Sequence, residues 1–557
     1  MQVQNPRSSD GRDAGSPASG ASMWSPLRGS VFRAVWIAWV VSNTGTWMQN
    51  VGAAWLMTTL TPSPLLVALM QTATSLPVFL VGLPAGALAD VVDRRKLLLV
   101  TQTWMLLAAL VLGVLTLAGL ASAGILLLFT FLIGLGTALT SPAWNAIIPE
   151  IVEREDLPAA VALNSTGYHV AQAVGPALGG FVVAAAGAAA AFLLNAASFL
   201  AVVGVIFRWR RTQVPSTAPP EAMLGATAAG LRYARHDRAL QAVLVRNGVF
   251  ILGASALWSL LPAMARHELG LDATGYGIVL GSLGLGAVGG ALLLPRLRRA
   301  LSVDTLTATA TLVFAGATLA LAYVRFVPLV LVSTMAGGLA WLVMLSTLTF
   351  SAQTASPAWV RARALAIYLL VFQGTLAVGS LAWGAVAERF GSSTALAFAA
   401  LALVCGLAAI IRWPLHVVQG RDLSPSGHWP DPKMAMTPDA ADGPVLITIE
   451  YRVPAERASD FIATMDAMRT FRRREGAISW GIFRDAADPD HYVETFLVLT
   501  WGEHMRQHAR VTVEDQILEA RRNAFLEPGV APLTSHLIDA HAFDGRTPAE
   551  PRYAELS

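Results

Sequence analysis

Three long stretches in the first part of this 557-residue chain contain no charged side chain. They cover residues 34–89, 97–149 and 157–207. Each is long enough for two of the ~20-residue apolar helices that cross a lipid bilayer. A turn signal lies near the middle of each stretch, at Thr61–Pro64, at Ala121–Gly124 and around Gly187. This pattern predicts six membrane-spanning helices before residue 208.

The rest of the hydrophobic region follows the same pattern, with one helix in each uncharged stretch. These stretches cover residues 247–265, 273–295, 305–324, 326–360, 364–387 and 392–411. Only 13% of all residues are charged and 55% are hydrophobic, whereas about a quarter are charged in an average globular domain. The sequence therefore predicts an all-α membrane protein with twelve transmembrane helices, six within 28–207 and six within 239–412.

The two halves of this region resemble each other when the chain is shifted by 204 residues. The shift aligns Gly86 with Gly290, Asn43 with Asn247, His169 with Gln373 and Gly187 with Gly391. A repeat of this length is too long for a solenoid. It is typical of transporters built from two duplicated membrane halves around a central site, so we expect two six-helix repeats.

The basic residues indicate the orientation in the membrane. Eighteen Lys and Arg residues, including Arg94 and Arg211, lie on one side of the predicted membrane, and three lie on the other: Arg266, Arg325 and Arg389. Because basic residues mark cytoplasmic loops, we expect both termini in the cytoplasm. The net charge of +3 then reflects topology, and the expected partner is the lipid bilayer, not a nucleic acid.

Composition defines the segments outside the predicted helices. They are a disordered cytoplasmic tail at 1–27, a cytoplasmic linker at 208–238, a second linker at 413–443, a soluble domain at 444–543 and a loose tail at 544–557. Within the first linker, Met223–Arg238 predicts a helix with apolar residues on one side and arginines on the other. Both a helix on the inner membrane surface and a solvated linker helix are compatible with this pattern.

The soluble domain has alternating strand and helix patterns. We expect strands at Val445–Val453, Ile478–Arg484, Tyr492–Trp501 and Leu533–Ile538, and helices at Ala458–Arg474 and Glu503–Phe525. The order β-α-β-β-α-β predicts a ferredoxin-like α+β sandwich.

A loop motif follows the second predicted span. It consists of Gly86, Asp90, Arg94 and Arg95 and resembles the loop motif of the major facilitator superfamily. The resemblance implies that Asp90 is part of a conformational latch, an ion pair or helix cap that breaks and re-forms during transport, and that Gly86 allows close helix contact. The alternative is that the arginines only anchor the loop inside. A partial second copy contains Gly290, Arg298 and Arg299, with Leu294 at the position of Asp90.

A second motif lies in the fifth predicted span. It consists of Gly175, Pro176, Gly179 and Gly180 and resembles the Gly-Pro motif of exporters in the same superfamily. Small residues permit tight helix packing, and proline bends a helix. An ordinary packing seam would explain the packing but would not indicate the direction of transport.

Longer sequence segments indicate which branch of the superfamily the chain resembles. Gly45–Met48, Leu83–Asp90, Ser141–Pro149 and Asp156–Leu157 are similar to the exporter branch that includes the bacterial enterobactin exporter. This resemblance implies a multi-pass protein of the bacterial inner (plasma) membrane. The soluble domain resembles antibiotic-biosynthesis-monooxygenase-like domains, which implies a homodimer formed through its sheet.

Polar residues inside the predicted spans are candidates for the substrate cavity, because polar groups are costly in lipid. They are Asn43, Trp47, Asn50, Gln172, Asn247 and Gln373. Interhelical hydrogen bonds are the alternative role for each. No carboxylate lies inside a predicted span, so His169 is the remaining titratable candidate for proton coupling.

Several other chemistries have no signature in the sequence. No Gly-x-x-x-x-Gly-Lys-Ser/Thr phosphate-binding sequence occurs, so transport must use a gradient. His504 and His508 lie at i, i+4 spacing, but no third metal ligand is apparent, and we expect neither a metal nor a cofactor.

Together these features predict a secondary transporter, not an enzyme, that exports a small and partly apolar molecule, such as a siderophore or drug-like compound, by alternating access. Two alternatives are a membrane-tethered enzyme whose C-terminal domain acts on a substrate handled by the helix bundle, and a membrane sensor that does not transport.

Overall fold

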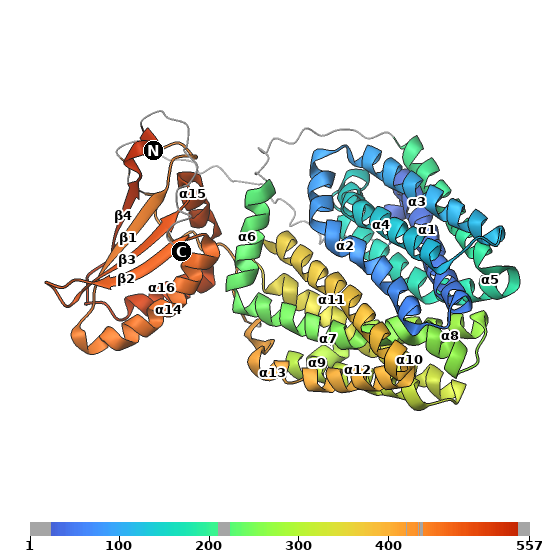
Figure 1. The fold of residues 1–557 in the computed structure, drawn as a ribbon. Coiled ribbons are helices and arrows are strands. Elements are labelled where there is room, and N and C mark those ends of the chain that lie inside the picture. Colours follow the sequence, from blue (N-terminus) through green and yellow to red (C-terminus); the bar gives the residue numbers. More distant parts are fainter. Residues whose placement is uncertain (1–23, 210–222, 419, 433, 435–437, 544–557) are drawn as a thin grey trace, which may run out of the picture. The chain divides into compact units, whose positions relative to one another are not determined.

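The computed structural model describes residues 24–209, 223–418, 420–432, 434 and 438–543 (Figure 1). Most of the predicted N-terminal tail, residues 210–222 of the first linker and the predicted tail at 544–557 lie outside these ranges.

The hydrophobic region is helical. Its helices are α1 (Ser30–Leu60), α2 (Pro64–Val91), α3 (Arg94–Leu117), α4 (Ala123–Ile151), α5 (Leu157–Arg208), α7 (Arg238–Ala263), α8 (Ala273–Ala300), α9 (Val303–Tyr323), α10 (Val327–Thr354), α11 (Arg361–Phe390), α12 (Ser392–Gly406) and α13 (Ala409–Arg412). Ten helices of the described ranges are long and apolar enough to cross a membrane. The 31-residue α1 is not among the ten, because its Ser, Thr, Asn and Gln residues lower its mean hydropathy.

Two glycines at equivalent places of the repeats break the helical path. The 52-residue α5 is two helices joined at Gly187, which has φ 79° and ψ 168°. Gly391 has φ 86° and ψ 152° and separates α11 from α12. A side chain with a Cβ rarely adopts such a φ. The predicted turn at Gly187 and its alignment with Gly391 are therefore confirmed by the backbone.

The 204-residue offset is not constant along the repeats. It separates the starts of α4 and α10 and of α5 and α11, but α2 and α8 end 209 residues apart. Asp93 caps α3 by accepting a hydrogen bond from Lys96 N. The residue 204 positions later, Leu297, lies inside α8 and cannot form such a cap. Ser302, 209 positions after Asp93, caps α9 instead, and α2 and α8 also start 209 residues apart. The gap-free alignment is therefore wrong for α2 and α8 and for the loop that follows them.

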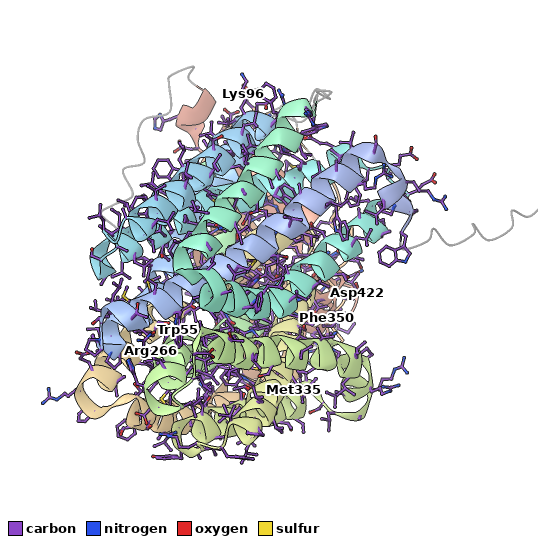
Figure 2. All side chains as sticks on the ribbon, turned by 90° about the vertical axis from the view of Figure 1, so that its right-hand side faces the viewer. Trp55, Lys96, Arg266, Met335, Phe350 and Asp422 are labelled. Carbon is purple, nitrogen blue, oxygen red and sulfur yellow. The ribbon has the colours of Figure 1, made fainter. Side chains whose placement is uncertain are left out.

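The chain forms two compact units. The first contains α1, α3, α4 and α5, the end of α2 from Pro84 and the start of α8 up to Gly284. Trp144, Leu163 and Ile206 belong to its apolar core near the inner loop motif. Lys96 and Trp55 lie at opposite ends of this unit (Figure 2), as the predicted topology requires.

The second unit contains the start of α2, α6 (Met223–His236), α7, the remainder of α8, α9 to α12 and the C-terminal domain. Here α2 packs on α11, where a Cβ added at Gly384 would lie 2.7 Å from Ala68 Cβ. Ser63 Oγ, just before α2, donates to the Glu388 carboxylate at 2.7 Å. Each unit thus contains the first part of one helix from the other repeat.

The C-terminal domain is a four-stranded antiparallel sheet with helices on one face (Figure 1). Its elements are β1 (Val445–Arg452), α14 (Ala458–Glu475), β2 (Ser479–Arg484), β3 (His491–Val498), α15 (Trp501–Arg510), α16 (Val513–Asn523) and β4 (Leu533–Ile538). The strand order is β2-β3-β1-β4. Alternate residues of β1, from Val445 to Tyr451, are buried against Phe461 and Met465 of α14, as a strand with one covered face requires.

The predicted helix Glu503–Phe525 is two helices. Thr512 starts α16 with a capping box, in which its side chain accepts from Asp515 N and the Asp515 carboxylate accepts from Thr512 N. This arrangement satisfies two amide groups at a helix start and ends α15 at Arg510. The predicted strand Tyr492–Trp501 is also shorter, because Trp501 opens α15.

Helix α6 (Met223–His236) connects the bundle with the C-terminal domain of the second unit. It packs against α14 and α11, with Ala229, Tyr233 and Ala234 buried. The Tyr233 hydroxyl donates to Ala355 O at 2.8 Å. Protein therefore covers Ala229, Tyr233 and Ala234 of this helix, whereas Leu231 is exposed.

Candidate functional site

The loop motif joins three helix ends of the first unit. Asp90 lies in the last turn of α2, and Arg94 and Arg95 open α3. Arg94 donates to Ala146 O at 3.2 Å and pairs with Glu150 of α4 at 2.8 Å. Cations beside the carbonyl end of a helix are stabilising. A Cβ added at Gly86 would meet no atom of the described residues within 4 Å, so this structure does not contain the expected close helix contact.

Arg95 makes equivalent contacts with the end of α5. It donates to Ile206 O at 3.1 Å and to Phe207 O at 2.6 Å, and its guanidinium lies 6.0 Å from the Phe207 ring centroid. The basic pair therefore connects the ends of α4 and α5. This is a structural role in addition to the alternative, in which the arginines only anchor the loop on the inner side of the membrane.

The second copy keeps only part of this arrangement. Arg298 donates to Ser346 O at 3.0 Å and lies 4.9 Å from the Phe350 ring centroid in α10. A Cβ added at Gly290 would lie 2.9 Å from Leu339 O, so this glycine does permit close contact. Arg299 lies exposed in the last turn of α8.

The Gly-Pro motif forms a tight seam in the first unit. Added Cβ atoms would lie 2.6 Å from Trp47 Cβ at Gly175 and 2.8 Å from Met48 Cα at Gly179. At Gly180 a Cβ would lie 2.6 Å from Ala273 O, and Gly277 of α8 has an equivalent contact with Pro176 O. Helix α5 thus meets α1 on one side and the start of α8 on the other without room for larger side chains.

The predicted cavity residues of the first repeat are half-buried. Asn43, Trp47 and Asn50 follow one face of α1, and Trp47 packs on Gly175. The Asn43 amide donates to Trp39 O of its own helix at 2.8 Å. On α5, His169 Nδ1 lies 3.4 Å from Gln172 Oε1. The structure brings this second pair together, whereas Asn43 uses its donor locally.

The predicted residues of the second repeat differ from each other. Asn247 of α7 is fully buried, and neither polar atom of its amide has a hydrogen-bond partner in the described part of the chain. One turn later Phe250 begins an aromatic cluster around Trp341, with ring centroids 5.2–6.1 Å from that of Trp341. Its other members are Trp258, Phe314 and Phe372. Gln373 of α11 is half-buried.

Two polar groups were not among the predicted site residues. Asn195 Nδ2 of α5 donates to Gln49 Oε1 of α1 at 2.6 Å, and both residues are buried. Arg246 of α7 pairs with Asp304 of α9 at 2.8 Å and lines a small hollow together with Phe250 and Leu403. In the sequence, these residues are recognisable only as polar residues within apolar stretches.

Asp304 also corrects the prediction that no carboxylate lies in a span, because α9 begins at Val303 and includes it. All Asp and Glu residues of the described spanning helices lie in a first or last turn. His169 therefore stays the candidate for a titratable group in mid-helix.

One of the buried polar clusters of the C-terminal domain surrounds Glu494. Glu494 accepts from Arg472, Tyr451 and Trp480 at 3.1, 2.6 and 2.9 Å. Burial raises the pKa of Glu494, but Arg472 and these hydrogen bonds outweigh it and hold the pKa below its usual range. The charges are matched within the core, so this cluster is explained by packing.

Another cluster contains His504 and His508 of α15 with His536 of β4. Burial lowers the pKa of His504 to about 3, with smaller effects of His536 and His508 in the same direction and of Gln507 in the opposite one. The sequence suggested the first two residues but not His536, which the fold brings beside them.

A family model described as "Transmembrane secretion effector" matches residues 21–543. The chain belongs to this family of the major facilitator superfamily. As a transmembrane secretion effector it is a multi-pass membrane transporter and not an enzyme. The match extends over the C-terminal domain as well as the helices.

Known transporters are similar to this transmembrane secretion effector over most of its helical region. The staphyloferrin A transporter of Staphylococcus aureus (strain NCTC 8325 / PS 47) is 21% identical over 365 residues, which are 65% of this chain and 90% of that protein. The multidrug efflux pump Tap of Mycolicibacterium fortuitum is 24% identical over 67% of this chain and 93% of that protein. The enterobactin exporter EntS of Shigella boydii is 27% identical over 47% of this chain and 62% of that protein.

Solved structures share the fold of the helical region. A bacterial homolog of the human lysosomal transporter Spinster, inward-facing and unoccupied, has a TM-score of 0.56 and 14% identity over 71% of this chain and 96% of that chain. An inward-facing bacterial homologue of the iron transporter ferroportin has a TM-score of 0.55 and 16% identity over 69% of this chain and 98% of that chain.

Proposed function

We propose that the protein exports a small, partly apolar molecule of the siderophore or drug-like class from a bacterial cell by alternating access. The observation that carries the proposal is the glycine seam of α5 with α1 and α8. A Cβ at Gly180 or Gly277 would overlap backbone atoms of the facing helix, so these helices can approach or separate without side chains between them. The similarity to a staphyloferrin A transporter, a multidrug efflux pump and an enterobactin exporter supports the substrate class.

The proposed topology has twelve spans. Counting α5 as two spans divided at Gly187 and adding α1 to the ten apolar helices gives this number. The contacts of Arg94 and Arg95 with the ends of α4 and α5, and of Arg298 with α10, support a cytoplasmic location of these basic loops in the inner (plasma) membrane. Both termini would then be cytoplasmic.

In this mechanism Asp90 takes part in the conformational latch, at the end of α2 beside the basic pair. The substrate cavity would contain the predicted polar and aromatic residues of both repeats: Asn43, Trp47, Asn50, Gln172, Asn247 and Gln373. Protons would be the coupling ion, with His169 as the titrating group. Half-burial of His169 and its contact with Gln172 support this role.

The C-terminal domain is proposed to be a ferredoxin-like, monooxygenase-like sandwich that forms a homodimer through its open sheet face. The strand order β2-β3-β1-β4 supports the sandwich. Phe483, Leu533 and Leu537 are 60%, 62% and 53% exposed on the face that carries no helices, which supports a second copy as the cover. The dimer should be lost in Leu537→Lys and kept in a variant of the exposed Glu456.

The direct test uses inverted membrane vesicles with an imposed pH gradient and a panel of siderophores and drugs. We expect uptake of some compounds into inverted vesicles, its loss with a protonophore, and a strong reduction in Asp90→Asn with unchanged substrate binding. Asp93→Asn is the matched control, because Asn also caps α3. Uptake into right-side-out vesicles, or reporter fusions that place residue 415 outside, would contradict the proposal.

A further inference from the structure

Three imidazoles converge at the edge of the C-terminal domain. His504 and His508 lie one turn apart on α15, and His536 lies on the edge strand β4. One ring nitrogen of each lies within 4.8 Å of those of the other two. His504 Nε2 and His508 Nε2 are 3.3 Å apart, and the His504 ring centroid lies 4.9 Å from that of His508 and 4.8 Å from that of His536.

Local structure places all three rings. Thr500 starts α15 by accepting a hydrogen bond from Glu503 N, so residues 504 and 508 share one helix face. His536 pairs in register with Ile447 of β1, which is buried under the helices. Residues opposite each other in adjacent strands point to the same face, and His536 therefore points toward α15.

The orientation of His504 leaves a lone pair on Nε2. Gln507 Nε2 donates to Glu475 O at 3.2 Å, so its Oε1 is the atom that meets His504 Nδ1, at 3.2 Å. An amide oxygen only accepts, and Nδ1 must therefore carry the proton. A hydrogen bond from the outer nitrogen of an imidazole is also what fixes metal-binding histidines in proteins.

We propose that His504, His508 and His536 bind a divalent metal ion of the Zn²⁺ type, with the fourth position open to water or a small ligand. Imidazole nitrogen is a preferred ligand of Zn²⁺ and of related transition-metal ions such as those of Cu and Ni. A tetrahedral ion with Zn–N bonds of ~2.0–2.1 Å separates its ligand atoms by roughly 3.3–3.4 Å, which agrees with the 3.3 Å between His504 and His508. Adjacent ligands of a square-planar ion lie closer, at roughly 2.8 Å.

Binding would have a structural consequence. The ion would tie α15 to β4, and Glu503 of α15 accepts from Arg232 of α6 at 3.1 Å. The alternative is a neutral hydrogen bond between the two imidazoles of α15. That bond, like the metal site, leaves His508 Nδ1 buried without a partner among the described residues, but it gives His536 no role.

The test uses the purified full chain without a polyhistidine tag, stripped with a chelator and titrated with Zn²⁺ against a chromophoric competitor. We expect one tightly bound Zn²⁺ per chain. X-ray absorption should show three imidazoles at ~2.0 Å. His508→Ala and His536→Ala should each weaken binding by at least about 100-fold, and Gln507→Ala by about 10- to 100-fold. His491→Gln, a histidine elsewhere in the domain, should bind like the parent.

Thermal melting separates binding from folding. In the chelator-treated proteins the half-buried variants His508→Ala and His536→Ala should melt close to the parent. Added Zn²⁺ should raise the Tm of the parent and of His491→Gln only, because an ion that binds the folded state stabilises it. Equal Zn²⁺ binding by parent and His508→Ala, or a Tm that Zn²⁺ does not change in the parent, would overturn the proposal.

Discussion

Arg421 and Asp237 form a buried, bidentate ion pair between the second linker and the start of α7. Arg421 Nη2 lies 2.9 Å from Asp237 Oδ2, and Nη1 lies 3.2 Å from Oδ1. Asp237 is 4% exposed and also caps α7 by accepting from Leu240 N at 2.9 Å. Arg421 Nε donates to Glu514 of α16 at 2.8 Å. One carboxylate thus links a bundle helix to the C-terminal domain.

Asp237→Asn should destabilise this link by about 3 kcal/mol, because it leaves the buried Arg421 short of negative charge. Asn retains the helix cap, so the loss reports the ion pair. Hydrogen exchange of the full chain should become faster in α6 and α16. Arg235→Gln, an exposed site on α6, is the control. Exchange in α6 as slow as in the parent would show that the contact adds no stability.

Glu475 should make the stability of the C-terminal domain depend on pH. Burial raises its pKa to about 7, Arg474 lowers it and Asp515 raises it again. One oxygen accepts from Arg474 Nε at 3.0 Å, and Oε2 has no hydrogen-bond partner in the described ranges. The folded state therefore binds the proton more tightly than the unfolded state. This contribution is complete below about pH 4.5 and is lost as the pH rises through 7.

Glu475→Gln imitates the protonated side chain and should remove this dependence. The difference in free energy of unfolding between variant and parent should grow by about 3 kcal/mol in favour of the variant from pH 4.5 to pH 8. Hydrogen exchange of β1 and β3, corrected for intrinsic rates, measures it in the full chain. Glu456→Gln, an exposed acid, is the control. If the difference in free energy of unfolding did not change with pH, a group other than Glu475 would bind the proton.

Local signals predicted much of the fold, and contacts between distant segments explain what they missed. The turn at Gly187 and the strand Leu533–Ile538 follow from residue type and alternation alone. The break between α15 and α16 had a sequence signal in Thr512 and Asp515 that the helical pattern concealed. His536 had none, because its approach to α15 depends on which strand forms the sheet edge. The pair of Asp237 with Arg421 joins residues 184 positions apart.

Gly180→Ala should shift the conformational equilibrium of the transporter. The new Cβ would lie 2.6 Å from Ala273 O and 2.9 Å from Gly277 Cα. Because both are backbone atoms, no change of side-chain rotamer can relieve the overlap. We expect the state with α5 and α8 apart to gain about 1–3 kcal/mol. Spin labels at the outer ends of these helices would report longer distances, with slower transport. Gly204→Ala is the control, since a Cβ there meets no atom within 4 Å. Unchanged distances would exclude the seam from the transport cycle.

His169→Gln should abolish pH-driven accumulation while downhill flux continues. Glutamine keeps a polar group beside Gln172, which lies 3.4 Å from His169 in the parent, but it cannot bind a proton in the working pH range. It also reproduces the aligned residue Gln373. Uptake by inverted vesicles with and without a pH gradient measures the difference, and His236→Gln in α6 is the control. Equal dependence on the gradient would move coupling elsewhere, with Asp90 next to be tested.

Asn247 and Asn43 should respond differently to loss of their amides. Asn247 is 0% exposed and its amide is unpaired among the described residues, whereas Asn43 already donates to Trp39 O. If Asn247 binds a polar group of the substrate, Asn247→Leu forfeits about 0.5–1.5 kcal/mol, close to a tenfold loss of affinity. The same variant removes a buried unpaired amide, so the Tm without substrate should rise. Asn43→Ala should change affinity little. Folded yield, Tm and substrate binding of both variants test whether Asn247 binds substrate. If the Asn247→Leu protein is less stable and has normal affinity, Asn247 is a structural residue between helices.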